Sequence, residues 1–241
     1  YAPDGNAIVT RNLVKRLIPD VAEAETMEDL TTARFDYSKL DNDESNVRIR
    51  LNSMGINIKT IDKGNKVAVT YVRGGEASRV KGKHCIYAGF HMYLPHLCPE
   101  LPEKQKAALK DNVKMPFIAA NVFLRNSKPI QELGTGSFYF PGRVLHECVT
   151  WGRSLGEHKQ DFVADDPVTI YMIGPMVDAH TNLNPPDQYR QGRHKLLAMT
   201  FEDYEIEVRE QMASLFASTS FDVKEDIIGL TINRWPHGYT R

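Results

Sequence analysis

The spacing of apolar residues changes along the chain, and this change limits the folds that the chain can adopt. In the first eighteen residues apolar side chains recur at helical spacing, whereas from Val47 they alternate with polar ones, as in half-buried strands. The turn sequences Asp62-Lys63-Gly64-Asn65 and Arg73-Gly74-Gly75-Glu76 divide the alternating region. The pattern therefore predicts a meander of short antiparallel strands that ends with an apolar run at 84–88.

The second half of the chain mixes the two spacings. Strands are predicted at 117–124, 138–140, 168–173 and 227–235, and helices at 103–110, at 188–199 and after Thr200. Thr200 and Asp203 have the spacing of a capping box, in which each side chain accepts a hydrogen bond from the other residue's backbone N–H. A helix, a meander and then intermingled strands and helices predict an α+β fold, in place of a regular doubly wound sheet.

Charge and composition argue against several kinds of partner. The 30 Lys and Arg residues nearly balance the 31 Asp and Glu residues, so the formal net charge of −1 gives no general attraction to nucleic acid. No run of about 18 apolar residues occurs, so no membrane span is predicted. The 3 cysteines have no metal-ligand spacing, and neither a P-loop nor a complete dinucleotide fingerprint is present. We expect neither a nucleic-acid partner nor a metal site.

Several short sequences, in the same order along the chain, resemble the flavin-containing amine oxidases. They are Pro3-Asp4-Gly5-Asn6 with the helix after it, the strands of the meander, Leu101-Pro102-Glu103-Lys104, Asn121-Val122-Phe123-Leu124-Arg125 and Asn233-Arg234-Trp235-Pro236-His237-Gly238-Tyr239. The last is the most specific, and within the family it is most similar to the bacterial spermidine dehydrogenases. The resemblance covers nearly the whole chain but only the middle of the family's pattern.

The resemblance implies a division of the chain into functional parts. Residues 1–95 correspond to part of an FAD-binding domain that contains the meander. Residues 96–228 correspond to a substrate-binding domain with a mixed sheet flanked by helices, and 229–241 to a strand that returns toward the FAD-binding domain. The family's Rossmann unit and final flavin-binding segment lie outside the matched region. We therefore expect the remainder of the enzyme as a partner, on the same or another chain, and no tight binding of FAD by this chain alone.

The resemblance also implies roles for single residues. Asn121 takes the position at which many members carry a Lys that holds a water against the flavin, so it is the catalytic candidate. The substrate candidates are Trp235, Tyr239 and Glu147, because aromatic rings and a carboxylate attract a cationic amine. The FAD candidates are Ser53, Met54, Gly55, Ala88, Gly89 and again Trp235. Where the family usually reads Ser-x-Val, this chain has Ser53-Met54-Gly55, which keeps a backbone contact but removes an apolar one.

The activity implied by the resemblance is oxidation of a small-molecule amine, with a polyamine such as spermidine among the candidates. FAD accepts hydride from the carbon next to a neutral amine, and the resulting imine is hydrolysed. Two alternatives stay open. One is a structural or binding subunit that kept the substrate-domain fold without the cofactor site. The other is an amino acid oxidase, for which Arg143 or Arg153 would bind the substrate carboxylate. Asn121 and Trp235 also have a purely structural interpretation, as residues of the core.

Overall fold

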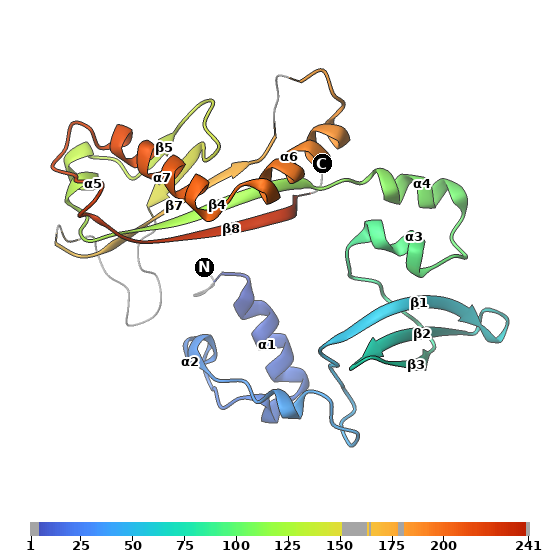
Figure 1. Ribbon diagram of the computed structural model, residues 1–241. Helices are drawn as coiled ribbons and strands as arrows, with labels where there is room; N and C mark the ends of the chain where they lie inside the picture. Colours follow the sequence, from blue (N-terminus) through green and yellow to red (C-terminus); the bar gives the residue numbers. More distant parts are fainter. Residues whose placement is uncertain (1–4, 151–162, 164, 178–180, 240–241) are drawn as a thin grey trace. The chain divides into compact units, whose positions relative to one another are not determined.

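The computed structural model describes residues 5–150, 163, 165–177 and 181–239 (Figure 1). These residues form two compact units. The first unit contains the residues up to Gly89 together with 95–101, and the second contains 90–94, 102–150 and the described residues after 162. No helix in this part of the chain combines the length and the apolar character that a membrane span requires. The division into an FAD-binding part and a substrate part stays a prediction.

Helices in the first unit enclose a small apolar core. They are α1 (Ala7–Leu17), η1 (Pro19–Val21), α2 (Met27–Thr32) and η2 (Tyr37–Lys39). α1 ends at Leu17, shortly before Pro19, because proline cannot continue the ladder of backbone hydrogen bonds. Farther along the chain, α2 begins with a capping box between Thr26 and Asp29.

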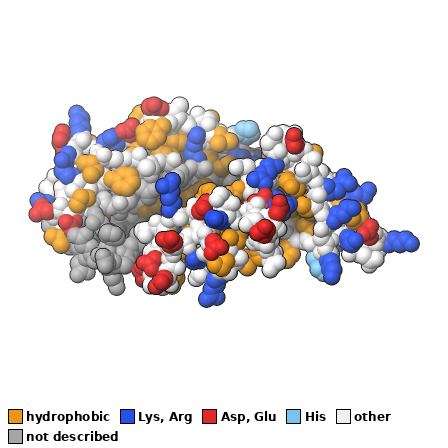
Figure 2. Space-filling view, turned by 90° about the horizontal axis from the view of Figure 1, so that it is seen from below, with side chains coloured by type: hydrophobic (Ala, Val, Ile, Leu, Met, Phe, Trp, Pro, Cys, Tyr) orange, Lys and Arg blue, Asp and Glu red, His pale blue; other side chains and the backbone are white. Residues whose placement is uncertain are grey.

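The meander is confirmed as a three-stranded antiparallel sheet. Its strands are β1 (Ser53–Ile61), β2 (Lys66–Arg73) and β3 (Glu76–Gly82), in that order across the sheet, and η3 (Asp62–Gly64) forms part of the first turn. Every residue of β3 is exposed. Figure 2 shows Lys and Arg side chains gathered over this sheet.

Two of the strands predicted for the meander are wrong. The alternation at 47–51 does not form a strand. Arg48 and Arg50 form ion pairs with the carboxylate of Asp41. Ile49 packs against the small core, and its backbone N–H donates a hydrogen bond to the Leu40 carbonyl. The run at 84–88 is likewise outside any strand. The third strand is the charged segment β3, which carries no apolar alternation for the sequence to reveal.

A second, five-stranded sheet organises the second unit. Its strands are β4 (Met115–Leu124), β5 (Ser137–Tyr139), β6 (Glu147–Thr150), β7 (Val168–Pro175) and β8 (Ile227–Tyr239), arranged in the order β5-β6-β7-β4-β8. Each neighbouring pair is antiparallel, so the sheet is not of the mixed kind that the resemblance implies. The predicted α+β class is confirmed.

Two long helices, α6 (Pro185–Ala198) and α7 (Phe201–Leu215), cover one face of this sheet (Figure 1). The capping box predicted for Thr200 and Asp203 is confirmed, with hydrogen bonds of 2.8 and 3.2 Å. The remaining helices are short: η4 (His91–Tyr93), α3 (Leu94–Leu97), α4 (Glu103–Asp111) and α5 (Lys128–Leu133). The core between helices and sheet includes Ile118, Ala120, Val122, Leu124, Ile170, Met172, Leu196, Tyr204, Val208 and Met212.

Candidate functional site

The sheet face opposite α6 and α7 carries the predicted catalytic and substrate residues. Even-numbered residues of β4 pack into the core, and side chains alternate along a strand, so the odd-numbered residues point to the other face. Asn121 is one of them, and the pairing register places Tyr171 of β7 and Thr231 of β8 directly beside it. We call this surface the Asn121 face; it comprises Phe117, Asn121, Glu147, Tyr171, Thr231, Trp235 and Tyr239.

Trp235 lies on the Asn121 face, opposite Phe117 of β4. Phe117 and Asn121 are four residues apart on one strand, which separates Trp235 from Asn121 by about 14 Å along the sheet. Tyr239 follows a register shift in β8 and sets its ring edge-to-face with that of Phe117, with the centroids 5.1 Å apart. Trp235 is 44% exposed and Tyr239 is 62% exposed, so both rings present open surface on this face.

Glu147 lies on the same face, two strands from β4. It pairs with Ile173 of β7, which in turn pairs with Ala119 of β4. Tyr171 lies between Glu147 and the residues of β8. Burial raises the pKa of Tyr171, and the nearby Tyr239 and Glu147 raise it further. The four residues proposed from sequence for catalysis and substrate binding therefore share one surface.

The sequence reasoning did not single out Tyr171, although a signal for it was present. In the strand predicted around it, Val168, Ile170 and Met172 are the regularly spaced apolar residues, and they enter the core. Tyr171 has the opposite phase, which predicts the other face of the sheet. Only the strand register shows that this face is also that of Asn121.

Asn121 is held in place by its neighbour on β8. Its Nδ2 donates a hydrogen bond of 3.0 Å to the Thr231 hydroxyl. This bond uses one of the two amide N–H groups and leaves the amide oxygen as an acceptor. Because an amide cannot take up a proton at neutral pH, Asn121 can orient a water or an amine but cannot act as a base. Its catalytic role stays a prediction.

The FAD candidates other than Trp235 all belong to the first unit. Ser53, Met54 and Gly55 open β1, where Met54 is 71% exposed and Gly55 lies at an irregularity in the pairing with β2. Ala88 and Gly89 follow β3 outside any strand, and a Cβ on Gly89 would lie 2.8 Å from the ring of Tyr87. The contact of these residues with a cofactor stays a prediction.

The segment that contains Trp235 is anchored by side chains from other elements. Arg193 of α6 donates a hydrogen bond of 3.0 Å from Nε to the carbonyl of Pro236. The ring of His237 stacks at 4.6 Å on that of Phe90. Burial lowers the pKa of His237, and Arg193 and Lys114 lower it further. His237 therefore favours its neutral form and has a structural position beside the site.

The Arg candidate for a substrate carboxylate points away from the Asn121 face. Nη1 of Arg143 lies 3.4 Å from Glu207 and 3.7 Å from Glu210, both on α7 on the helix-covered side of the sheet. Arg153 lies outside the described residues. Within the described ranges no group of three His, Cys, Asp or Glu side chains is arranged to hold a metal ion.

Comparison with known proteins gives a structural likeness only. Neither the protein-family models nor the curated proteins gave a match. Among solved structures, a triple mutant of putrescine oxidase is similar with a TM-score of 0.50 and 13% identity, over 75% of this chain and 34% of that one. Cyclohexylamine oxidase from Brevibacterium oxydans has a TM-score of 0.49 and 11% identity, over 75% of this chain and 33% of that one.

The likeness to the putrescine oxidase variant concerns the fold alone, because the sequence identity is low. The chain spans about a third of the length of the solved structures that it matches. It is thus an α+β chain that shares its fold with part of an amine oxidase. What the chain binds and what reaction it takes part in are proposals.

Proposed function

We propose that this chain is a segment of an FAD-dependent amine oxidoreductase and that the Asn121 face forms one wall of its amine site. The proposal rests on one observation: Asn121, Glu147, Trp235 and Tyr239, which are distant in sequence, share a single sheet face. The fold shared with part of putrescine oxidase supports it. The alternative of an amino acid oxidase has less support, because Arg143 pairs with α7 on the other side of the sheet.

The side chains of the Asn121 face suit an amine and a planar ring. The exposed rings of Trp235 and Tyr239 offer flat surfaces on which an aromatic heterocycle or an organic cation packs favourably. FAD, when bound, would supply the acceptor for the hydride. In this scheme Trp235 and Tyr239 position the amine and exclude water, while Asn121 orients the amine nitrogen or a water through its amide.

A polyamine such as spermidine suits this surface as a substrate. Glu147 and Trp235 are three strands and two residue positions apart, or about 16 Å. A substrate with one amine at the reacting end and another ammonium group farther along its chain would bind both the aromatic rings and the carboxylate. We expect Glu147→Gln to raise KM for spermidine more than KM for a monoamine of similar apolar size.

The full-length protein that contains this chain provides the test. We expect it to be yellow, and its flavin absorbance to bleach when spermidine or putrescine is added without oxygen. A colourless protein that takes up no FAD would contradict the proposal and favour the alternative of a structural or binding subunit.

The variant Trp235→Ala tests the location of the site. Its side chain is 44% exposed, so its loss should cost less stability than the about 3–5 kcal/mol typical of a core Trp. A misplaced substrate should lower the rate of flavin reduction by about a hundredfold. Phe201→Ala is the matched control, because Phe201 is 48% exposed but lies on α7. Full activity of Trp235→Ala with a collapsed melting temperature would make Trp235 a core residue only.

A further inference from the structure

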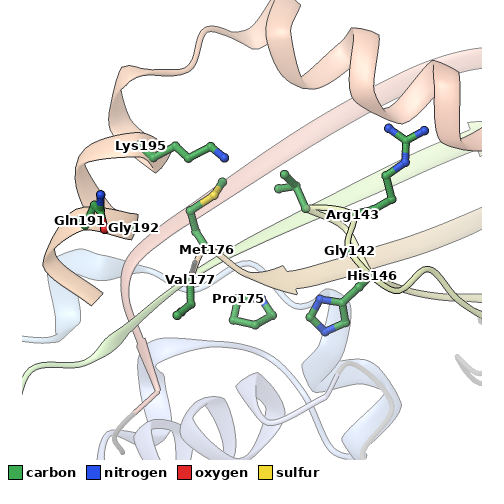
Figure 3. Close-up of a pocket in the computed structure, with 10 residues that line it drawn as sticks. Gly142, Arg143, His146, Pro175, Met176, Val177, Gln191, Gly192 and Lys195 are labelled. Atoms are coloured by element: carbon green, nitrogen blue, oxygen red, sulfur yellow. The ribbon is translucent and has the colours of Figure 1, made fainter. Parts of the chain in front are cut away.

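A pocket of about 630 Å³ lies at the end of β7 in the second sheet (Figure 3). Its walls are the turn before β6, the end of β7 and the middle of α6, all within the second unit. A volume of this size is typical of sites for small molecules. Pro175 of the lining pairs with Phe117, so the pocket lies beside the Asn121 face; the inference does not rest on the proposed amine oxidation, because its ligand is an anion.

Backbone contacts at two glycines hold the pocket walls together. A Cβ on Gly192 of α6 would lie 1.7 Å from the carbonyl oxygen of Met176, and one on Gly174 of β7 would lie 1.9 Å from that of Val144. These distances are far below van der Waals contact, so only glycine lets the segments approach so closely. These contacts fix the positions of α6, the end of β7 and the turn before β6 relative to one another, and side chains of the three segments line the cavity between them.

Basic side chains surround this pocket. Arg143, His146 and Lys195 line it together with the amide of Gln191, and no acidic side chain is among the described lining residues. Figure 3 shows Lys195 reaching inward from α6, with Arg143 and His146 on the opposite side. The Lys195 ammonium forms no ion pair with another described residue.

Two carboxylates of α7 neutralise Arg143. Its Nη1 donates a hydrogen bond of 3.4 Å to Glu207 and lies 3.7 Å from the carboxylate of Glu210. Neither Glu is a lining residue. Among the described lining residues the charge without an ion-pair partner is therefore the Lys195 ammonium, and an anion would gain from it.

We propose that this pocket binds an organic anion, namely a carboxylate attached to an apolar body. Lys195 and the amide of Gln191 supply the donors for the carboxylate. Val144 and Met176, with Pro175 and Val177 beside them, supply the apolar wall for the rest of the molecule. A bare inorganic anion would leave that apolar wall unused.

Octanoate is a suitable probe for the 241-residue chain, with binding followed by calorimetry. We expect saturable binding at one site, which weakens as salt is added because the site is open to solvent. Octylamine has the same apolar body with the opposite charge, and inorganic phosphate has charge without the body. We expect both to bind at least tenfold more weakly. Equal binding of octylamine, or of phosphate, would overturn the proposal.

Lys195→Gln is the decisive variant. We expect it to weaken octanoate binding at least tenfold with no change in melting temperature, because Lys195 is exposed. Lys104→Gln is the matched control, since Lys104 is also an exposed lysine on a helix of the second unit, away from the pocket. Absence of saturable octanoate binding to the unaltered chain, or equal binding to Lys195→Gln, would overturn the proposal.

Discussion

Replacing Gly192 by alanine would test the close packing of α6 on the end of β7. The added methyl carbon would lie 1.7 Å from the Met176 carbonyl oxygen and 2.9 Å from its carbonyl carbon. Carbon side-chain atoms essentially never approach other heavy atoms closer than 3.0 Å, so the helix or the strand end must shift by more than an ångström. The obstacle is backbone, which cannot move aside as a flexible side chain can.

Two effects of Gly192→Ala oppose one another. Alanine favours a helix over glycine by about 1 kcal/mol, which alone would stabilise α6. Overpacking a close contact costs about 1–3 kcal/mol, and more when the neighbour is rigid. We expect the clash to dominate and to lower the free energy of unfolding by about 2 kcal/mol, which corresponds to a fall of roughly 6 °C in melting temperature for a unit of this size.

Thermal unfolding followed by circular dichroism would measure the effect of Gly192→Ala. His194→Ala is the control, because His194 is an exposed residue of the same helix and its replacement changes helix propensity without a clash. We expect the control to melt at or slightly above the temperature of the unaltered chain. A Gly192→Ala variant that melts as high as the control would refute the close approach of the two backbones.

Two further predictions concern titratable groups. Hydrogen bonds and charge from Arg48 and Arg73 lower the pKa of Asp41 from its ordinary 3.8 to about 2. This carboxylate therefore contributes stability above about pH 4, which is lost as the pH falls toward 2. We expect Asp41→Asn to lower the melting temperature of the chain at pH 6 and to have little effect near pH 2; an equal effect at both would contradict the assignment. Burial raises the pKa of Cys148 to about 12, whereas Cys85 is exposed. A thiol reagent should label Cys85 in the folded chain and Cys148 only after unfolding, because the thiolate is the reactive form. Rapid labelling of Cys148 in the folded chain would contradict this expectation and would show that β6 opens to solvent.

The sequence predicts an element well when burial of one face, or a capping box, alone determines its residue pattern. β4, β7 and β8 are apolar because a face of each is buried under helices, and α7 begins at a capping box whose two members are only three residues apart. The alternation at 47–51 misleads because its arginines serve an ion-pair cluster around Asp41. β3 could not be predicted from the sequence, because a fully exposed strand has no buried face that requires apolar residues at every second position.

Some residues of the candidate site could likewise be proposed from the sequence, and others could not. Asn121, Trp235 and Tyr239 are proposed from short sequences similar to those of a known family, whereas Glu147 is proposed for its carboxylate on a candidate strand. Tyr171 and Thr231 join them only through strand register, which depends on pairing between segments distant in sequence. The pocket beside Lys195 could be predicted even less from the sequence, because its lining residues come from three separate segments.

The exposed strand β3 has a consequence for how copies of this chain behave in concentrated solution. Among the described strands it lies at an edge of its sheet, and an edge strand presents backbone N–H and C=O groups that are a template for a strand from another molecule. Arg79, Lys81 and Lys83 lie on or directly after this edge. Two such edges brought together would set lysine and arginine against one another, and the repulsion opposes fibre-like growth from this sheet.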